Sequence, residues 1–428
     1  MRSIYSQSEW DWFFCGIDLL NVGISLKKRF YFRYNNRNSV KIQEVGAMKE
    51  ALNRLRPRLM EIFTYLHGNP EISWHEIETT NYIFDLLTRE GFSPVRFKNI
   101  TGLYVDVGNG EPKVGLRTDI DALWQEVDGE FRANHSCGHD GHMTMAIGAL
   151  LLLKELAQSF NGTIRVIFQP AEEKGTGALA VLKEGIIDDL DFLFGVHVRP
   201  VHELEDGTYC AALYHGASRL LEGEIIGEDA HAARPHLGVN AIEVGATIIE
   251  DLRTIHTDPM VPVSIKMTKF QAGGDSGNII PGNASFTIDI RAQQNDVMDA
   301  LAQGVKRVID SAKLLYKVQI ELRTVANVVA AEVDLTAQYI MEQAIVQAVG
   351  LSKLRKPVRT PGGEDFHHYA VQRPHLKSTM LGLGCGLTPG LHHPKMRFKQ
   401  ARLVTGVEIL TRAVLLALAS GKTKEGSA

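Results

Sequence analysis

The sequence predicts an α/β protein in which a smaller α+β unit is inserted into a larger one. Short apolar runs typical of buried strands alternate with helical patterns, which favours a layered fold with a largely parallel sheet. One stretch instead has the order strand-helix-strand-strand-helix-strand, the ferredoxin-like split βαβ pattern. The length of 428 residues also exceeds what a single simple core usually organises. We therefore predict two structural domains.

The larger unit is predicted to open with two helices. Within residues 49–90, apolar side chains recur at three- and four-residue steps, with one break at Gly68-Asn69-Pro70. The apolar runs that we interpret as strands cover residues 114–116, 164–168 and 192–196. Helical patterns cover residues 143–156, 334–349 and 400–418. Together these elements form the predicted α/β layer.

The inserted unit is predicted to cover residues 218–326, so that the larger unit comprises residues 48–217 and 327–428. Its expected elements are a strand at 220–226, a helix at 240–255, strands at 263–270 and 284–291, a helix at 295–314 and a strand at 317–325. This order gives a four-stranded sheet with two helices.

The first 47 residues differ from the rest, being rich in aromatic side chains, Arg and Asn without a clear period. We predict that they form a non-native or disordered extension. The segment Gln43-Glu44-Val45-Gly46-Ala47 can be encoded by a purine-rich, ribosome-binding sequence just upstream of a start codon for Met48. The alternative is a genuine but poorly ordered extension. N-terminal sequencing of protein from the native source distinguishes the two.

Composition narrows the class of partner and the compartment. A net charge of -4 and an isoelectric point near 6.5 provide no broad basic surface for nucleic acid, so a small-molecule substrate is favoured. The apolar stretch at residues 10–25 is interrupted by Asp18 and predicts neither a signal peptide nor a membrane span. The cysteines form no regular framework, which indicates a reducing compartment, by default the cytoplasm. They are Cys15, Cys137, Cys210 and Cys385.

Two segments carry the chemistry. Residues 136–142, Ser-Cys-Gly-His-Asp-Gly-His, supply a thiol and two imidazoles, and residues 169–173, Gln-Pro-Ala-Glu-Glu, supply a carboxylate pair. This ligand set suits a borderline-soft divalent metal and leaves a carboxylate to handle protons. Cys137 alone would be read as a buried structural cysteine, but His139 two residues later in a glycine-bearing loop favours a ligand. The chain is predicted to be a metallohydrolase.

With these segments and five others in order, the chain resembles the M20 metallopeptidase and amidohydrolase family. It is most similar to the branch with hippurate hydrolases, N-acyl-amino-acid amidohydrolases and auxin-conjugate hydrolases. The resemblance implies a zinc-exopeptidase-like catalytic domain and a lid or dimerisation role for the inserted unit. The further matching segments are residues 116–123, 195–197, 231–236, 362–366 and 391–394.

The resemblance implies two divalent ions, zinc or manganese, with Cys137 as the bridging ligand. Of the adjacent pair His392 and His393, the first is favoured as a ligand, although spacing alone does not separate them. His142 is interpreted either as a residue that supports the ligands or as polar surface. The implied ligands are Cys137, His139, Glu173, His197 and His392.

The resemblance also assigns roles to carboxylates near the ions. Glu172 is the implied general base, which takes a proton from water and passes it to the departing nitrogen. Asp119 and Asp121, at the end of a predicted strand, are expected to orient ligating histidines. For Asp121 a plain capping role is the alternative.

Three residues of the inserted unit complete the implied site. His231 is expected to stabilise the oxyanion, from its own subunit or from a partner subunit. Asn278 and Arg291 are expected to hold a substrate carboxylate, for which the two-pronged guanidinium is suited. The segment Gly227-Glu228-Asp229-Ala230 departs from the glycine-rich lead-in of the family, which puts the conformation of the loop before His231 in doubt.

The predicted activity is hydrolysis of an N-acyl amino acid to a carboxylic acid and a free amino acid. One alternative is a metallo-exopeptidase of the same fold, and another is a thiol amidase with Cys137 as nucleophile and His139 as base. A non-catalytic binding protein is a third. The sequence leaves the acyl group, the amino acid and the native metal open. Neither nucleic acid nor a membrane is expected as a partner, and the sequence leaves open whether the inserted unit forms a homodimer.

Overall fold

The structure is a computed structural model that describes residues 40–156 and 160–420 of the chain. It opens with the two predicted helices, α3 (Val40–Gly68) and α4 (Ile77–Arg89). Helix α3 thus begins upstream of Met48, and a boundary between compact units falls within it, after Asn53. Residues 1–39, which make up most of the predicted extension, lie outside the described residues, and the start at Met48 stays a prediction.

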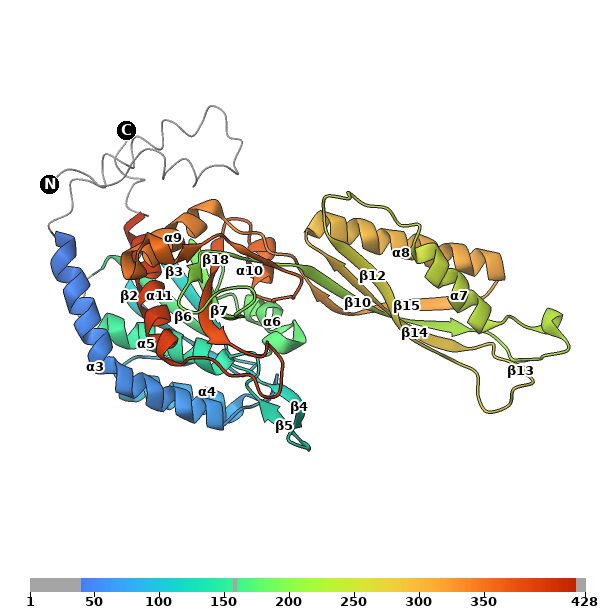
Figure 1. Cartoon of the computed structure of the whole chain (residues 1–428), viewed down its shortest axis with the longest axis horizontal. Helices are drawn as coiled ribbons and strands as arrows, with labels where there is room; N and C mark the ends of the chain where they lie inside the picture. Colours follow the sequence, from blue (N-terminus) through green and yellow to red (C-terminus); the bar gives the residue numbers. More distant parts are fainter. Residues whose placement is uncertain (1–39, 157–159, 421–428) are drawn as a thin grey trace, which may run out of the picture. The chain divides into compact units, whose positions relative to one another are not determined.

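An eight-stranded sheet forms the body of the larger unit (Figure 1), in the order β1-β2-β6-β3-β7-β18-β8-β16. The four central strands are parallel, whereas β1, β2 and β8 pair antiparallel with their inner neighbours. The prediction of a largely parallel sheet is therefore right only for the centre, and the sheet as a whole is mixed. The strands are β1 (Val95–Arg96), β2 (Leu103–Asn109), β3 (Lys113–Asp119), β6 (Gly162–Gln169), β7 (Phe192–Pro200), β8 (Tyr209–Cys210), β16 (Leu354–Arg355) and β18 (Lys377–Leu387).

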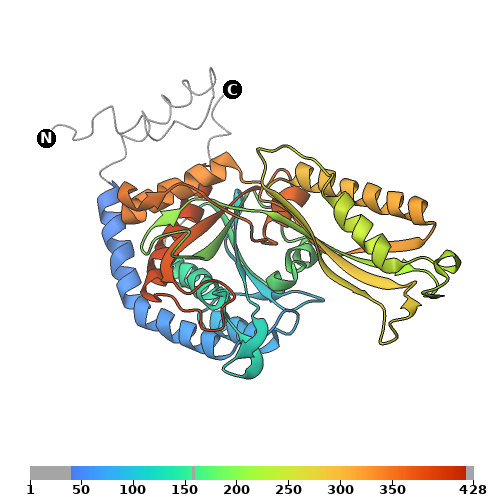
Figure 2. The ribbon, with the colours of Figure 1, turned by 45° about the vertical axis from the view of Figure 1, so that its right-hand side comes forward.

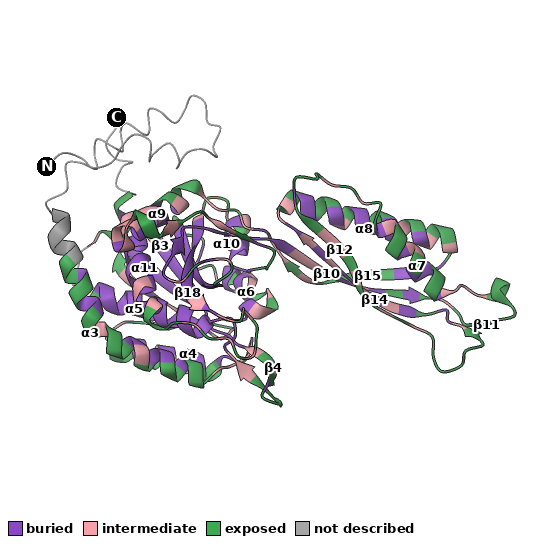
Figure 3. Ribbon diagram, viewed as in Figure 1, coloured by how far each residue is buried: buried purple, intermediate pink, exposed green. Residues whose placement is uncertain are grey.

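Helices cover both faces of this sheet, and the central strands between them are buried (Figure 3). One face packs against α5 (His139–Glu155), α9 (Leu335–Val349) and α11 (Ala401–Ser420), the other against α6 (Gly177–Lys183) and α10 (His367–Gln372). Among the described helices, α11 is long and apolar enough to cross a membrane, but 67% of its apolar window is buried inside the protein. A core helix of a folded domain passes the same test, and α11 packs on α5 and α9.

The layout of the sheet places the chemistry-bearing segments at one edge. The parallel strands β3 and β6 end at Asp119 and Gln169, and the carboxyl ends of parallel strands meet at the same edge. Helix α5 begins at His139, four residues before the predicted start at Met143. Polar residues fill this first turn, so apolar periodicity does not reveal it. Nearby lie the hairpin β4 (Leu123–Val127) and β5 (Glu130–Asn134), and the short pair β9 (Leu213–His215) and β17 (Val358–Thr360).

All six predicted elements of the inserted unit are present. They form a four-stranded antiparallel sheet in the order β12-β14-β10-β15, with both helices on one face (Figures 1 and 2). A two-stranded sheet of β11 (Ala230–His231) and β13 (Ile279–Ile280) was not predicted. The main elements are β10 (Ala217–Ile226), α7 (Ala241–Leu252), β12 (Val263–Ala272), β14 (Ala284–Ala292), α8 (Asn295–Tyr316) and β15 (Gln319–Val328).

The core of the inserted unit requires a glycine on β10. Gly223 lies opposite Phe286 of β14, and a Cβ on this glycine would stand 2.1 Å from the Phe286 ring. The missing side chain of Gly223 therefore lets the buried Phe286 ring pack flat against the strand.

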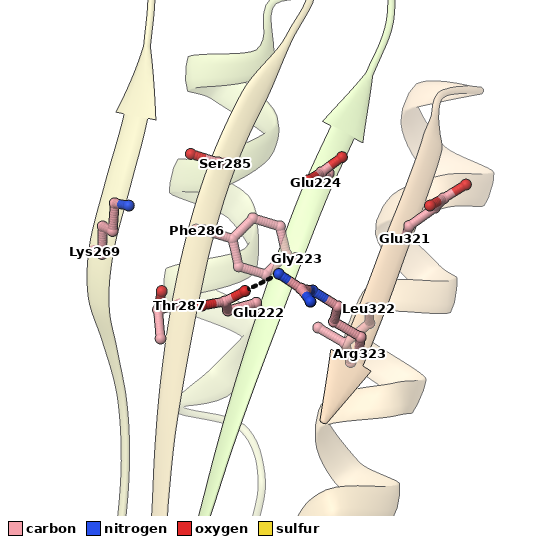
Figure 4. Close-up of a pocket in the computed structure, with 10 residues that line it drawn as sticks. All are labelled: Glu222, Gly223, Glu224, Lys269, Ser285, Phe286, Thr287, Glu321, Leu322 and Arg323. Carbon is pink, nitrogen blue, oxygen red and sulfur yellow. Dashed lines mark hydrogen bonds and ion pairs between the residues drawn. The ribbon is translucent and has the colours of Figure 1, made fainter. Parts of the chain in front are cut away.

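The outer face of the same sheet carries a pocket lined by polar side chains. Among them, Glu222 and Arg323 form an ion pair (Figure 4).

We predict that Gly223→Ala lowers the free energy of unfolding by about 1–3 kcal/mol, because the added methyl group overpacks the site against the ring. Urea denaturation followed by circular dichroism measures the change. Gly274→Ala is the matched control, since a Cβ there meets no atom within 4 Å. Equal stability of the two variants would contradict the proposed packing.

Candidate metal centre

The turn that begins α5 presents the first two candidate ligands. Cys137 and His139 flank Gly138, which has φ 89° and whose added Cβ would stand 2.5 Å from the Val198 side chain. Only glycine combines this backbone conformation with so close a neighbour. Both flanking side chains are buried. The glycine thus allows the thiol and the imidazole to approach the end of β7 together.

The five predicted ligands come together in two overlapping groups. The ligand atoms of Cys137, His139 and His197 lie within 4.8 Å of one another, and so do those of Cys137, Glu173 and His392. Cys137 is common to both groups. This is the arrangement expected of two ion positions that share a bridging ligand.

The structure also separates the two adjacent histidines. His392 has φ 62°, and its Nε2 lies 3.5 Å from Oε1 of Glu173. His393 is exposed, and its Nδ1 accepts a hydrogen bond from the Lys395 amide. Only His392 therefore faces the candidate ligands.

Buried atoms in the two groups lack partners in a way that fits a metal. The Nδ1–H of His139 donates to the Asp121 carbonyl oxygen at 2.9 Å, while its Nε2 has no hydrogen-bond partner among the described residues. Oε1 of Glu173 is likewise buried without a hydrogen bond in the described chain. Such orphans are rare in native proteins and call for a ligand, an ion or water. Thiolate, imidazole and carboxylate are ligands that zinc accepts.

Asp121 joins the ligand-bearing segments. Its Oδ1 lies 3.2 Å from Nδ1 of His139, and its Oδ2 accepts hydrogen bonds from the Glu173 amide at 3.0 Å and from the Ser73 hydroxyl at 2.6 Å. These are the contacts of an orienting residue and not those of a simple cap.

Among the histidines, Asp119 lies closest to His142, and its Oδ2 is also 3.8 Å from Nε2 of the predicted ligand His139. It accepts a hydrogen bond from Nδ1 of His142 at 2.8 Å, and Nε2 of His142 accepts the Val198 amide at 3.0 Å. His142 is fully buried, so its interpretation as polar surface is wrong. With both ring nitrogens occupied, it supports the strand end beside His197 and is not free to bind an ion.

Glu172 and Glu173 begin a short 3₁₀ helix after β6 and point to different partners. Glu173 reaches the group with His392, while Oε2 of Glu172 lies 3.8 Å from Nε2 of His139. Burial, together with the neighbouring carboxylate of Glu364, raises the pKa of Glu172 well above its usual value. A buried carboxyl with a raised pKa beside a ligand cluster has the properties of a proton-transfer group.

A buried ion network behind Glu172 was not predicted. The guanidinium of Arg117 is fully buried and lies 2.8 Å from the carboxylates of both Asp119 and Asp365. It also donates to the Gln169 side chain at 2.8 Å. The amide of Asp365 in turn donates to Glu172 at 3.4 Å. The matching segments include Arg117 and Asp365, but pairing between such distant positions is not visible in one sequence.

The three candidate residues of the inserted unit do not all come together. His231 and Asn278 are neighbours, since the amide after His231 donates to the Asn278 carbonyl oxygen at 2.9 Å. The Nδ1 of His231 accepts the Ala233 amide, which leaves Nε2–H of the exposed ring as a donor without a hydrogen-bond partner among the described residues. Arg291 lies near the other end of β14, about 23 Å along the strand from Ala284, and it is paired with Asp289. Among the described contacts, none joins these three residues to the metal-ligand groups.

The unusual segment before His231 has its own support. The amide of Gly227 donates to the Asn283 side chain at 3.3 Å, and the carboxylate of Asp229 accepts the Gly282 amide at 2.8 Å. A Cβ on Gly282 would stand 2.3 Å from the Glu228 backbone. The loop is therefore fixed by side-chain hydrogen bonds to the segment before β14.

The chain is similar to one protein family and to several named proteins. The model of peptidase family M20/M25/M40 matches residues 115–416. The N-acetyl-L-cysteine deacetylase of Bacillus subtilis is 30% identical over 82% of this chain and 86% of its own length. The N-acyl-L-amino acid amidohydrolase of Geobacillus stearothermophilus is 27% identical over 61% of this chain and 74% of its own. The solved structure of the YXEP protein of Bacillus subtilis, described as a dinuclear metal binding peptidase from the M20 family, superposes with a TM-score of 0.72 at 26% identity. That match covers 87% of this chain and 99% of the other.

Proposed function

The chain belongs to peptidase family M20/M25/M40 and is a metal-dependent amidohydrolase, and from this premise we propose that it cleaves the amide bond of N-acyl amino acids. The products are a carboxylic acid and a free amino acid. The observation that carries the proposal is the convergence of five ligand side chains on two positions that share Cys137, with Glu172 beside them. Relatives whose names describe deacetylation or deacylation of amino acids support this substrate class.

The cofactors that we propose are two divalent ions, zinc or manganese. His139 and His197 would hold one ion, Glu173 and His392 the other, and Cys137 both. When bound, such ions supply Lewis-acid polarisation of a carbonyl and lower the pKa of water. The similarity to the YXEP protein, a dinuclear metal binding peptidase, supports the number of ions but leaves their identity open.

The protein's own groups then have distinct tasks. Glu172, buried and close to His139, accepts the proton of the attacking water and delivers it to the departing nitrogen. His231 offers its Nε2–H to the oxyanion, and Asn278 lies next to it. Arg291 is paired with Asp289, so it would bind a substrate carboxylate only after this ion pair breaks.

A homodimer through the inserted unit is part of the proposal. Strand β12 is an edge of its sheet, and Ile242 and Ile249 lie exposed on one side of the adjacent helix α7. An unpaired edge beside apolar side chains favours strand pairing with a second copy. Light scattering of the purified protein measures the mass, and a Val263→Lys variant on this edge tests the surface. We also propose a reducing compartment, the cytoplasm, supported by the buried free thiols of Cys137, Cys210 and Cys385.

The substrate class is tested by hydrolysis of acetyl, benzoyl and indolyl amino-acid conjugates beside a set of dipeptides, with defined zinc or manganese supplementation. We expect at least one acyl-amino acid to exceed every dipeptide in kcat/KM by about tenfold or more, a difference within the reach of pocket contacts. Preferential cleavage of dipeptides would replace the proposal with a metallo-exopeptidase.

A further inference from the structure

The turn that carries Glu172 has an unusual backbone. Ala171, the residue before it, has φ 52° and ψ 42°, the left-handed conformation that residues other than glycine rarely adopt. Ala171 is fully buried and joins the end of β6 to the 3₁₀ helix of Glu172 and Glu173. Such a conformation persists only where surrounding contacts impose it. The direction in which Glu172 leaves β6 therefore depends on what holds Ala171.

A buried carboxylate from a distant segment holds it. Glu76, at the start of α4, is fully buried, and its Oε1 accepts the amide of Ala171 at 2.8 Å. The other carboxylate oxygen accepts the Thr101 hydroxyl at 2.6 Å. Both oxygens thus have defined partners, and the side chain has one orientation.

The other contacts of the turn show why Glu76 matters for Glu172 in particular. The amide of Glu173 is held separately by Asp121, which also contacts His139. The carbonyl oxygen of Ala171 accepts the Gly177 amide at 3.2 Å. Within this turn the Glu76 carboxylate bonds to the residue that precedes Glu172, and its two hydrogen bonds to the described chain involve no candidate metal ligand. Loss of this carboxylate would free Ala171 while Glu173 stays tethered.

We propose that Glu76 is a positioning residue: by holding the Ala171 amide, its carboxylate fixes the left-handed turn that directs Glu172 toward the metal-ligand groups. The inference rests on the proposed role of Glu172 as the base. It adds a residue whose side chain is hydrogen-bonded neither to the candidate ligands nor to Glu172 itself. A group that acts this way affects the chemical step more than substrate binding.

The experiment compares kcat, KM and metal content of Glu76→Ala and Glu76→Gln with those of Glu71→Ala. We expect Glu76→Ala to lower kcat about 30- to 100-fold with KM changed less than about threefold and both ions retained. Glu76→Gln keeps an acceptor for the Ala171 amide and should recover kcat to within about fivefold of the parent. Glu71 is the matched control, because it lies in the same segment between α3 and α4 as Glu76 and its carboxylate also accepts backbone amides, those of Glu78 and Thr79 in α4.

Glu71→Ala should lower the melting temperature by loosening α4 but leave kcat within about twofold. A loss of kcat in Glu71→Ala equal to that in Glu76→Ala, or loss of an ion together with activity in Glu76→Ala, overturns the proposal. If Glu76→Ala does not fold, Thr101→Val is measured instead, because it removes one hydrogen-bond partner of the Glu76 carboxylate. An unchanged kcat in Thr101→Val counts against the proposal. If Glu172→Ala retains turnover, the proposed function fails. If Glu76→Ala retains turnover while Glu172→Ala loses it, only the inference about Glu76 fails.

Discussion

Glu172→Ala is expected to lower turnover by about 10²- to 10⁴-fold, the range that a positioned general base contributes. The side chain is 9% exposed, and its carboxylate lies 3.8 Å from Nε2 of His139. In its absence, the described chain offers Glu364 and Asp365 nearby, but both are engaged by Arg117. The measurement is kcat for the best acyl-amino acid, together with metal content by elemental analysis.

The metal content decides how this result is interpreted. Two ions per chain are expected in Glu172→Ala, because Glu172 is not among the five proposed ligands, which form the two groups that share Cys137. Glu172→Gln, which preserves the shape of the side chain, should be nearly as inactive, since an amide does not accept the proton. Glu130→Gln, on the exposed turn of the β4–β5 hairpin, is the control and should retain turnover. Near-normal turnover of Glu172→Ala with both ions bound would remove Glu172 from the role of base.

The elements of the fold were largely predictable because their patterns are local. The six elements of the inserted unit and the helices α3, α4, α9 and α11 follow from local patterns, in which neighbours lie two residues apart in strands and three or four apart in helices. The antiparallel pairs on either side of the four central strands, β1 with β2, β2 with β6 and β8 with β18, were not predicted. Strand direction at an edge depends on pairing between distant segments, which leaves no local signal. The first turn of α5 was missed because ligand-type residues occupy it.

The candidate site was predictable where residue type carried the information. Thiol, imidazole and carboxylate side chains in the matching segments converge, as the groups around Cys137 show. The contacts that hold these side chains in place could not be predicted from the sequence. Arg117 contacts Asp365, 248 positions away, and Glu76 accepts the Ala171 amide, 95 positions away. The choice between His392 and His393 depended on backbone conformation, a φ of 62° that the neighbouring residue types do not reveal. Supporting contacts of this kind are long-range and need the folded chain.

Removal of metal by a chelator is expected to lower turnover by at least about 100-fold and to lower the melting temperature. The loss of rate follows because Lewis-acid catalysis is worth several kcal/mol, and each 1.36 kcal/mol is a factor of ten. Stability falls by mass action, since a free ion at 1,000 times its Kd stabilises the native state by about 4 kcal/mol. The buried Nε2 of His139 and Oε1 of Glu173 would then lack partners within the described chain. Dialysis against zinc or manganese should restore both properties.

Chelator treatment distinguishes a metal enzyme from a thiol amidase, whereas mutation of Cys137 does not. Cys137→Ser should inactivate either enzyme, because one loses its bridging ligand and the other its nucleophile. Burial raises the pKa of Cys137 well above the usual thiol value, which disfavours the thiolate that a nucleophile needs in the absence of an ion. A bound cation would instead stabilise the thiolate and so favour loss of the thiol proton. Full activity of metal-free protein, verified by elemental analysis, would therefore contradict the metal-dependent assignment itself, whatever the Cys137→Ser variant does.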